Sequence, residues 1–282
     1  MKLHSSQHRA QTPSPSTISF CSEFIILSLL ILMILGQPAG AQQLDTTTVA
    51  NRAPLTAEQV VQNLVQMNLS RARALHTYQG TRTYRSEYHG FPGDRSAEMV
   101  VKVSYLSPRE KEFIVQSTTG SALIIDKVFK RLLEAEKEAL DAEIQRRSAL
   151  TEDNYRFTLV GYENDLLGAR YVLKVEPRVK DKFLYYGRIW VDAEDFAVVR
   201  LEAEPAKNPS LWIRKTEIEQ AYIKIGDFWL PSHNRSVTAI RLGGYAELTI
   251  DYKYYEIIGA SEVSGLSMSR SVPQAESGNA PR

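Results

Sequence analysis

Three consecutive runs of alternating apolar and polar residues between Gly168 and Pro205 constrain the fold most strongly. A period of two places one side of each run in a protein interior and the other in solvent, as in β-strands buried on one face. Tight-turn residues separate the runs at Asp181-Lys182 and at Ala193–Asp195. The stretch therefore predicts a meander of three antiparallel strands at the centre of a sheet, with these apolar residues on its buried face: Tyr171, Leu173, Val175, Ile189, Val191, Val199 and Leu201.

The first 41 residues have the pattern of an export signal. A weakly basic start precedes twelve residues of an apolar core from Phe24 to Leu35, and the small residues Ala39 and Ala41 follow. This order is typical of a cleavable signal peptide. The alternative is a transmembrane anchor, which needs roughly 20 apolar residues to cross a bilayer. We therefore expect cleavage after Ala41 and an exported, periplasmic protein.

Removal of that leader leaves a chain without net charge. The whole sequence has 34 basic and 33 acidic residues, and the leader contains Lys2, Arg9 and Glu23, so 32 residues of each sign remain. A neutral chain has no general attraction to nucleic acid or to an anionic membrane. The single cysteine, Cys21, also lies in the leader, so the mature protein has no disulfide and depends on its core for stability.

Two long helices and about ten strands are predicted in the mature chain. The first helix runs from Thr56 to Leu75, where Thr56 and Gln59 form the pattern of a capping box. The second runs from Ser121 to about Ser148, and its charged part from Glu134 to Arg147 is read as a solvated face. The predicted organisation is a leader (1–41), a flexible lead-in (42–55), one folded domain (56–258) and a disordered tail (259–282).

A sheet of so many antiparallel strands does not lie flat, because strands twist and a large sheet coils. We therefore predict an α+β fold in which a large curved antiparallel sheet forms an unclosed half-barrel. The two long helices are expected to cover its concave side, because each carries an apolar stripe that needs a partner.

Three strand motifs carry a resemblance to a known family: Tyr171–Pro177, Gly187–Asp192 with its Trp-x-Asp, and Gly226–Pro231 with its Trp-Leu-Pro. Together with the export signal and the two helices, they resemble the outer-membrane lipoprotein-sorting superfamily, which includes the LolA and LolB carriers and the lipid-sensing domain of the RseB/MucB regulators. The resemblance covers roughly residues 56–257 and implies an unclosed barrel with a helical lid and an apolar cavity for acyl chains. No ligand residue of the family can be matched to a position here.

No catalytic or metal-binding pattern is present in the sequence. It has no Gly-x-Ser-x-Gly elbow, no phosphate loop and no His-Glu-x-x-His helix. The histidines after the leader, His76, His89 and His233, lack metal-ligand spacing. We therefore predict that the protein is not an enzyme and needs no cofactor or metal.

The predicted function is a periplasmic carrier that holds acyl chains of lipids or lipoproteins in an apolar cavity during outer-membrane lipoprotein sorting. The alternative is a regulatory lipid sensor or scaffold that binds a membrane-bound or regulatory protein through the charged helix from Glu134 to Arg147. An exported enzyme with an unrecognised site is the third. Trp190 alternates with Ile189 and Val191, so it is either an outer-face aromatic or part of the cavity. The candidate cavity wall is Tyr171, Leu173, Val175, Ile189, Trp190, Val191, Val199 and Leu201.

Overall fold

The computed structural model describes residues 55–107, 110–166, 168–208, 210–241 and 243–258. The predicted leader and tail lie outside these ranges, as does nearly all of the predicted lead-in. Within them, no helix combines the length and the apolar character that a membrane span requires.

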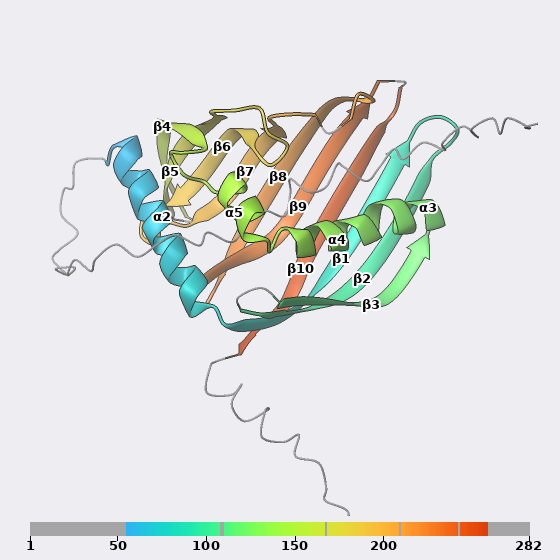
Figure 1. Cartoon of the computed structure of the whole chain (residues 1–282), viewed down its shortest axis with the longest axis horizontal. Coiled ribbons are helices and arrows are strands. Elements are labelled where there is room, and N and C mark those ends of the chain that lie inside the picture. The colour runs from blue at the N-terminus through green and yellow to red at the C-terminus, as the bar shows by residue number, and fades with distance from the viewer. Residues whose placement is uncertain (1–54, 108–109, 167, 209, 242, 259–282) are drawn as a thin grey trace, which may run out of the picture.

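Ten antiparallel strands form a single sheet, as the alternating patterns predict (Figure 1). Its order is β3-β2-β1-β10-β9-β8-β7-β6-β5-β4, so the first strand pairs with the last. The edge strands β3 and β4 do not pair with each other, which leaves the sheet unclosed. The strands are β1 (Thr77–His89), β2 (Arg95–Leu106), β3 (Glu110–Gly120), β4 (Tyr155–Asp165), β5 (Gly168–Pro177), β6 (Tyr185–Asp192), β7 (Val198–Pro205), β8 (Ile213–Ile225), β9 (Phe228–Ile240) and β10 (Tyr245–Ile258).

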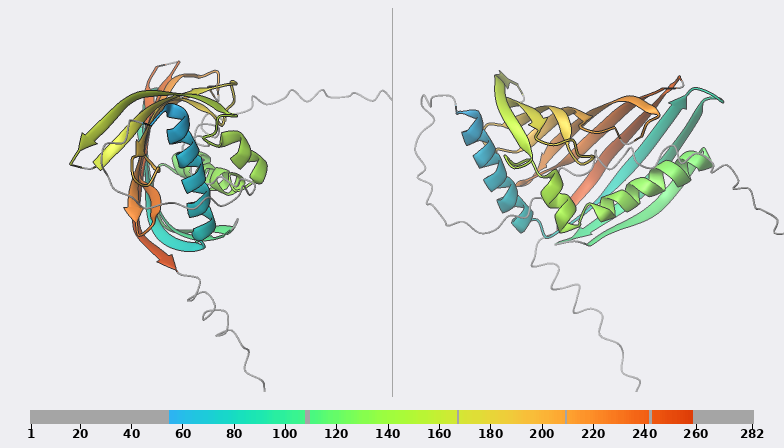
Figure 2. Two further views of the ribbon diagram at one scale, coloured as in Figure 1. Left: turned by 90° about the vertical axis from the view of Figure 1, so that its left-hand side faces the viewer. Right: turned by 45° about the horizontal axis from the view of Figure 1, so that its top comes forward.

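The connection from β3 to β4 joins the two edges of the sheet and is helical. We call it the crossing segment; it consists of α3 (Ala122–Ile124), the π-helix η2 (Ile125–Phe129), α4 (Lys130–Glu138) and α5 (Ala142–Ser148). Figure 2 shows that the sheet curves and that the crossing segment lies on one side of it. The residues of this side of the sheet that contact the helices define the inner face.

The predicted second helix begins as expected at Ala122, but the prediction that it continues unbroken to about Ser148 was wrong. The helix ends at Ala139, and Asp141 starts α5 by accepting hydrogen bonds from the backbone N–H groups of Glu143 (2.9 Å) and Ile144 (3.3 Å). Aspartate is a strong N-cap residue, because its side chain satisfies N–H groups that the first turn of a helix leaves unpaired. The inner face is therefore covered by α2, by a continuous helix over Ala122–Glu138 that includes the π-helical η2, and by the short helix α5.

The first helix, α2 (Ala57–Ala74), has the predicted cap. Thr56 and Gln59 exchange side-chain to backbone hydrogen bonds of 2.9 and 3.3 Å, which confirms the capping box. Near its other end, Arg71 donates to the backbone carbonyls of Asp195 (2.8 Å) and Phe196 (3.0 Å) in the turn between β6 and β7. These bonds fix the helix across the meander strands.

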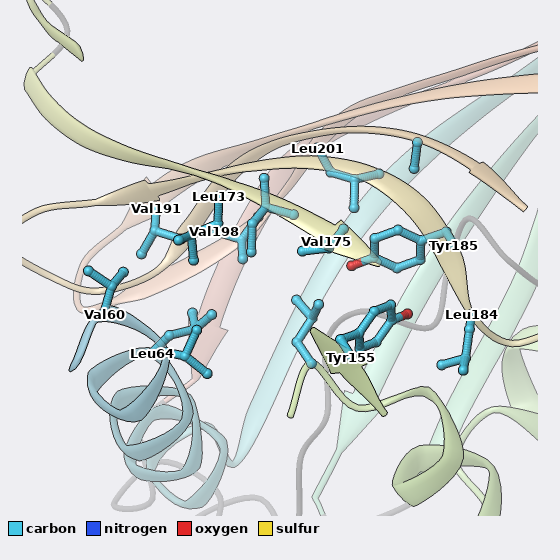
Figure 3. Packing of buried hydrophobic residues seen from close by; sticks show 14 of the residues in the cluster. Val60, Leu64, Tyr155, Leu173, Val175, Leu184, Tyr185, Val191, Val198 and Leu201 are labelled. Carbon is cyan, nitrogen blue, oxygen red and sulfur yellow. The ribbon is translucent and has the colours of Figure 1, made fainter. Parts of the chain in front are cut away.

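The central meander is present as strands β5, β6 and β7. Its apolar side chains form the largest buried cluster together with Val60, Val61 and Leu64 of α2. Figure 3 shows Val60 and Leu64 directed at the inner face of these strands. A second buried cluster lies under α4, against β1, β2 and β10. The core is therefore the layer between the sheet and its helices.

We expect Leu173→Ala to lower the free energy of unfolding by about 3 kcal/mol, because it removes a fully buried side chain from the meander and leaves a cavity. Urea unfolding followed by circular dichroism measures this loss. Leu166→Ala, at a fully exposed position in the turn between β4 and β5, serves as the control and should change stability by less than about 0.5 kcal/mol. Equal losses in the two variants would contradict the assigned core.

Candidate functional site

Six of the eight predicted cavity-wall residues share the inner face. Tyr171, Leu173, Val175, Ile189, Val191 and Leu201 are all buried in the cluster that α2 covers. Figure 3 shows Leu173, Val175, Val191 and Leu201 on one side of the strands, as the alternation predicts. Side chains of α2 occupy the space in front of them, so any ligand in contact with these residues would have to displace that helix or enter beside it.

Val199 does not follow the predicted alternation. Trp190 pairs with Arg200 while Val191 pairs with Val198, so Val199 is the extra residue of a β-bulge in β7. A bulge shifts the phase of a strand by one residue. Val198 consequently takes the buried position that the sequence pattern assigned to Val199, which is only half-buried.

Trp190 lies on the opposite face of the sheet from the inner cluster. Its indole N–H donates to the Glu163 carboxylate at 3.0 Å. The guanidinium groups of Arg188 and Arg200 lie over the ring at 5.5 and 4.8 Å from its centroid. Cation–π contacts of this kind bury an aromatic ring under polar side chains. Trp190 is therefore an outer-face aromatic in the described structure.

The second apolar cluster lies between the crossing segment and strands β1, β2 and β10. Phe129 and Leu132 of the crossing segment are fully buried against Met99, Val101 and Ile250 of the sheet. The ring of Phe129 lies 6.0 Å from that of Tyr84 on β1. The helix that supplies this cover is continuous from Ala122 to Glu138, because the residues at the joins between α3, η2 and α4 all have helical backbone angles, and it contains the π-helical stretch Ile125–Phe129.

A buried carboxylate connects the crossing segment to the sheet, and we call it and its two partners the latch. Glu136 of α4 accepts from Arg82 of β1 and from Lys111 of β3, each at 2.5 Å. All three side chains are at least nine-tenths buried. One helix residue thereby holds two strands of the sheet, at the end of α4 next to its break.

The latch carries one excess positive charge in an aromatic setting. The Arg82 guanidinium lies 4.9 Å from the ring centroid of Tyr252, and the Lys111 ammonium lies 6.0 Å from those of Tyr78 and Tyr105. Burial by itself would raise the pKa of Glu136, but the charges and hydrogen bonds of Arg82 and Lys111 outweigh burial and lower this pKa to about 2. Glu136 is therefore ionised at neutral pH, and it neutralises only one of its two partners.

Sequence reasoning missed the latch, although a signal was present. Glu136 falls four residues after Leu132 and three after Leu133, on the apolar stripe of the helix. Arg82 lies on the same, buried side of its strand as Tyr78 and Tyr84. A charged residue at a core position of two different elements indicates a buried ion pair, because such charges are rarely buried alone.

Several polar atoms at the helix–sheet interface have no hydrogen-bond partner among the residues that the structure describes. They include both amide atoms of Gln145 on α5 and the hydroxyls of Tyr185 and Tyr252 on the sheet, and all three residues are buried. Leaving a buried polar group unpaired costs about 1–3 kcal/mol. The contact between the crossing segment and the sheet is thus less favourable than its apolar area suggests.

The charged run from Glu134 to Arg147 is mostly paired with its own surroundings. Glu134 bonds Arg131, Glu143 bonds Arg146, and Arg147 bonds Asp181. These pairs lie at the surface and have small energetic value, as predicted for a solvated face. The prediction was wrong for Glu136, which lies in the same run and is buried in the latch. Among the described residues, no group of three or more histidine, cysteine, aspartate or glutamate side chains is arranged to hold a metal ion.

Comparisons with known proteins give structural matches alone. No family model matches the sequence, and no curated protein does. A DUF1329 family protein from Desulfovibrio piger matches with a TM-score of 0.38 and 13% identity, over 72% of this chain and 93% of that one. The LolA superfamily protein NE2245 from Nitrosomonas europaea matches with a TM-score of 0.31 and 11% identity, over 74% and 97% of the two chains. MucB matches with a TM-score of 0.28 and 13% identity, over 70% and 92%.

The chain thus has structural similarity to LolA superfamily, MucB and DUF1329 proteins at low sequence identity.

We expect Glu136→Gln to lower the free energy of unfolding by about 3–5 kcal/mol, because it leaves two buried cations without a counter-charge. Chemical unfolding at neutral pH measures the loss. Glu134→Gln removes an exposed charge from the same helix and should cost less than about 1 kcal/mol. Similar losses in both variants would show that the latch contributes no more than a surface pair.

The latch should also make stability depend on pH. A carboxyl group whose pKa is lowered on folding stabilises the native state above its unfolded pKa and loses this contribution as the pH falls through its folded pKa. For Glu136 that window runs from about 4.5 down to about 2. The difference in unfolding free energy between the wild type and Glu136→Gln should therefore shrink across this window, and a constant difference would contradict the lowered pKa.

Proposed function

We propose that this protein binds acyl chains of lipids or lipoproteins between the inner face of its sheet and the crossing segment, and carries them without covalent chemistry. The observation that supports this most directly is the cover itself. An apolar sheet face is covered by the helix over Ala122–Glu138, and one buried carboxylate of that helix bonds two strands of the sheet. In this proposal a bound acyl chain displaces the helix and packs on the same apolar face of the sheet.

The energetics favour such an exchange. Each methylene of an acyl chain transferred out of water contributes about 0.8 kcal/mol. An acyl chain that replaces Phe129 and Leu132 on the inner face would recover the burial that the sheet loses when α4 withdraws. The buried hydroxyl of Tyr252 lowers the cost of that withdrawal, because it has no hydrogen bond to α4 that would have to be broken.

The break between α4 and α5 supplies a place for the movement. Ala139 and Leu140 lie between two helices with separate caps, so α4 can shift while α5 stays bound to Asp181 through Arg147. Hinges of lids are typically a few residues at the ends of elements. In this proposal the release of Glu136 from Arg82 and Lys111 is the step that opens the site.

The pattern of the first 41 residues supports export, and a role in outer-membrane lipoprotein sorting in the periplasm is the specific form of the proposal. The carrier needs no catalytic group, because no bond is made or broken, and this agrees with the lack of a catalytic motif in the sequence.

A protein-binding regulator is the second candidate function. The open edge of β3 favours it, because this strand has eleven residues, pairs on one side alone and exposes Ile114 and Val115. An unpaired edge is a template for an extended segment of another chain. MucB, one of the structurally similar proteins, has been solved in complex with MucA. A regulatory protein that adds a strand to β3 would be the partner of this chain.

Acyl binding has a direct test. Native mass spectrometry of the mature protein purified from a bacterial periplasm should show adducts with the masses of acylated lipids. After delipidation, the protein should bind a fluorescent fatty acid. Glu136→Gln should bind this probe with an apparent Kd lower by about tenfold or more, because it raises the fraction of molecules with an open cover. Glu134→Gln should bind like the wild type.

A wild-type protein that carries no lipid and ignores the probe would overturn the carrier proposal. Equal binding by Glu136→Gln and by the wild type would support an acyl site but would show that the latch does not control access to it. If Glu136→Gln proves too unstable, Lys111→Met weakens the same contact while it leaves Arg82 and Glu136 as a neutral pair.

A further inference from the structure

Three turns meet at one end of the sheet. They are the β1–β2 turn, the β9–β10 turn and the loop between β7 and β8. The Arg241 backbone N–H donates to the Trp212 carbonyl at 2.8 Å, which joins the second turn to the loop. The rings of His89 and Tyr245 lie 4.9 Å apart and join the first turn to the second. Strands β1 and β10 lie so close here that a Cβ on Gly244 would lie 2.2 Å from the His89 carbonyl oxygen.

Large apolar side chains project from each of these turns. Phe91, in the β1–β2 turn, is 90% exposed, and Leu211, in the β7–β8 loop, is 88% exposed. Trp212 and Tyr245 stand beside them, each nearly half exposed. We call these four residues the rim patch. None of them belongs to the buried clusters of the described structure.

We propose that the rim patch is a membrane-docking surface that seats the protein on a lipid bilayer. Phe91 and Leu211 would enter the boundary of the acyl region, while Trp212 and Tyr245 would lie at the level of the headgroups. Tryptophan and tyrosine favour that level, because each combines an apolar ring with a polar atom. The exposed Arg95 and Arg241 on the same turns are placed to meet lipid phosphates, and Asp94 is occupied by His89.

The shape of the patch favours a lipid surface over a folded protein. A specific protein interface buries at least about 1,000 Å² in a contiguous, closely packed surface. The rim patch instead consists of separate side chains on the tips of narrow turns, a form that inserts between lipid headgroups. Its apolar residues, and not its charge, would supply most of the affinity, because the chain without its leader has no net charge.

The position of the patch also connects it with the cover of the inner face. The crossing segment begins at the same end of the sheet, where the Ser121 N–H donates to the Ser96 carbonyl at 2.8 Å on β2. Docking would therefore bring the start of the crossing segment to the membrane. The docking proposal nevertheless stands independently of the proposed acyl site, since it needs a bilayer alone.

The test uses the mature chain and vesicles of phosphatidylcholine with a minor fraction of phosphatidylglycerol. The wild type should co-sediment with these vesicles, and its tryptophan emission should shift to shorter wavelength. The shift should be lost in Trp212→Phe, because Trp190 is buried on the sheet and Trp229 lies at the far end of β9 from the rim patch, where its indole N–H donates to Asp195 at 2.8 Å. The double variant Phe91→Ser/Leu211→Ser should lower the partition coefficient by about tenfold or more, since two apolar side chains no longer enter the bilayer.

A matched control is available at the opposite end of the sheet. Leu166 and Tyr254 are exposed to a similar degree, at 105% and 81%, and the variant Leu166→Ser/Tyr254→Ser should bind vesicles like the wild type. Binding should persist in 1 M salt, where the Debye length is about 3 Å and surface charges are screened.

Absence of vesicle binding by the wild type, or equal losses in the two double variants, would overturn the proposal. Binding of the soluble fatty-acid probe is measured in the same variants, to distinguish a loss of membrane docking from a loss of acyl binding. Phe91→Ser/Leu211→Ser should bind the probe like the wild type, so a failure of docking and a failure of acyl binding give different patterns.

Discussion

The need to cover one apolar face of an unclosed sheet governs the rest of this structure. A closed barrel would bury such a face against itself, but β3 and β4 lie at opposite edges here and do not meet. The chain covers the face with α2 over the meander and with the crossing segment over β1, β2 and β10. The same segment has to travel from one edge to the other, so the cover and the connection are one element. Its freedom to move is limited by what it contacts, chiefly the latch.

The main effect of the latch is to position α4, and its net contribution to stability is secondary. A buried carboxylate between two cations gains Coulomb energy, but all three groups lose their hydration, and an apolar replacement of the same shape often stabilises a protein as much. The latch instead fixes the position of α4 on the sheet, because Glu136 has to accept hydrogen bonds from both Arg82 and Lys111. The excess positive charge that remains keeps the interface polar at one point within an otherwise apolar layer.

Much of the fold could be predicted from local patterns, and the failures have physical causes. The alternation in the meander predicted β5, β6 and β7, and the motif at Thr56 predicted the start of α2. The bulge at Val199 could not be read from the strand alone, because either Val198 or Val199 can fill an apolar position and the partner strand decides between them. The break at Ala139 was concealed by good helix formers on both sides, although Asp141 was a visible cap. The latch required two elements to be seen together, since its charges lie 54 positions apart in sequence.

The pairing of β1 with β10 affects when the chain can fold during its synthesis. Tyr84 lies opposite Ile250, so the middle of the sheet cannot form until nearly the whole domain has been synthesised. Contacts between residues so distant in sequence form slowly, because the loop between them must close first. A chain that is threaded through a membrane before it folds benefits from that delay, since an early stable core would block its passage. The strand order that leaves the sheet unclosed therefore also keeps the nascent chain unfolded for longer.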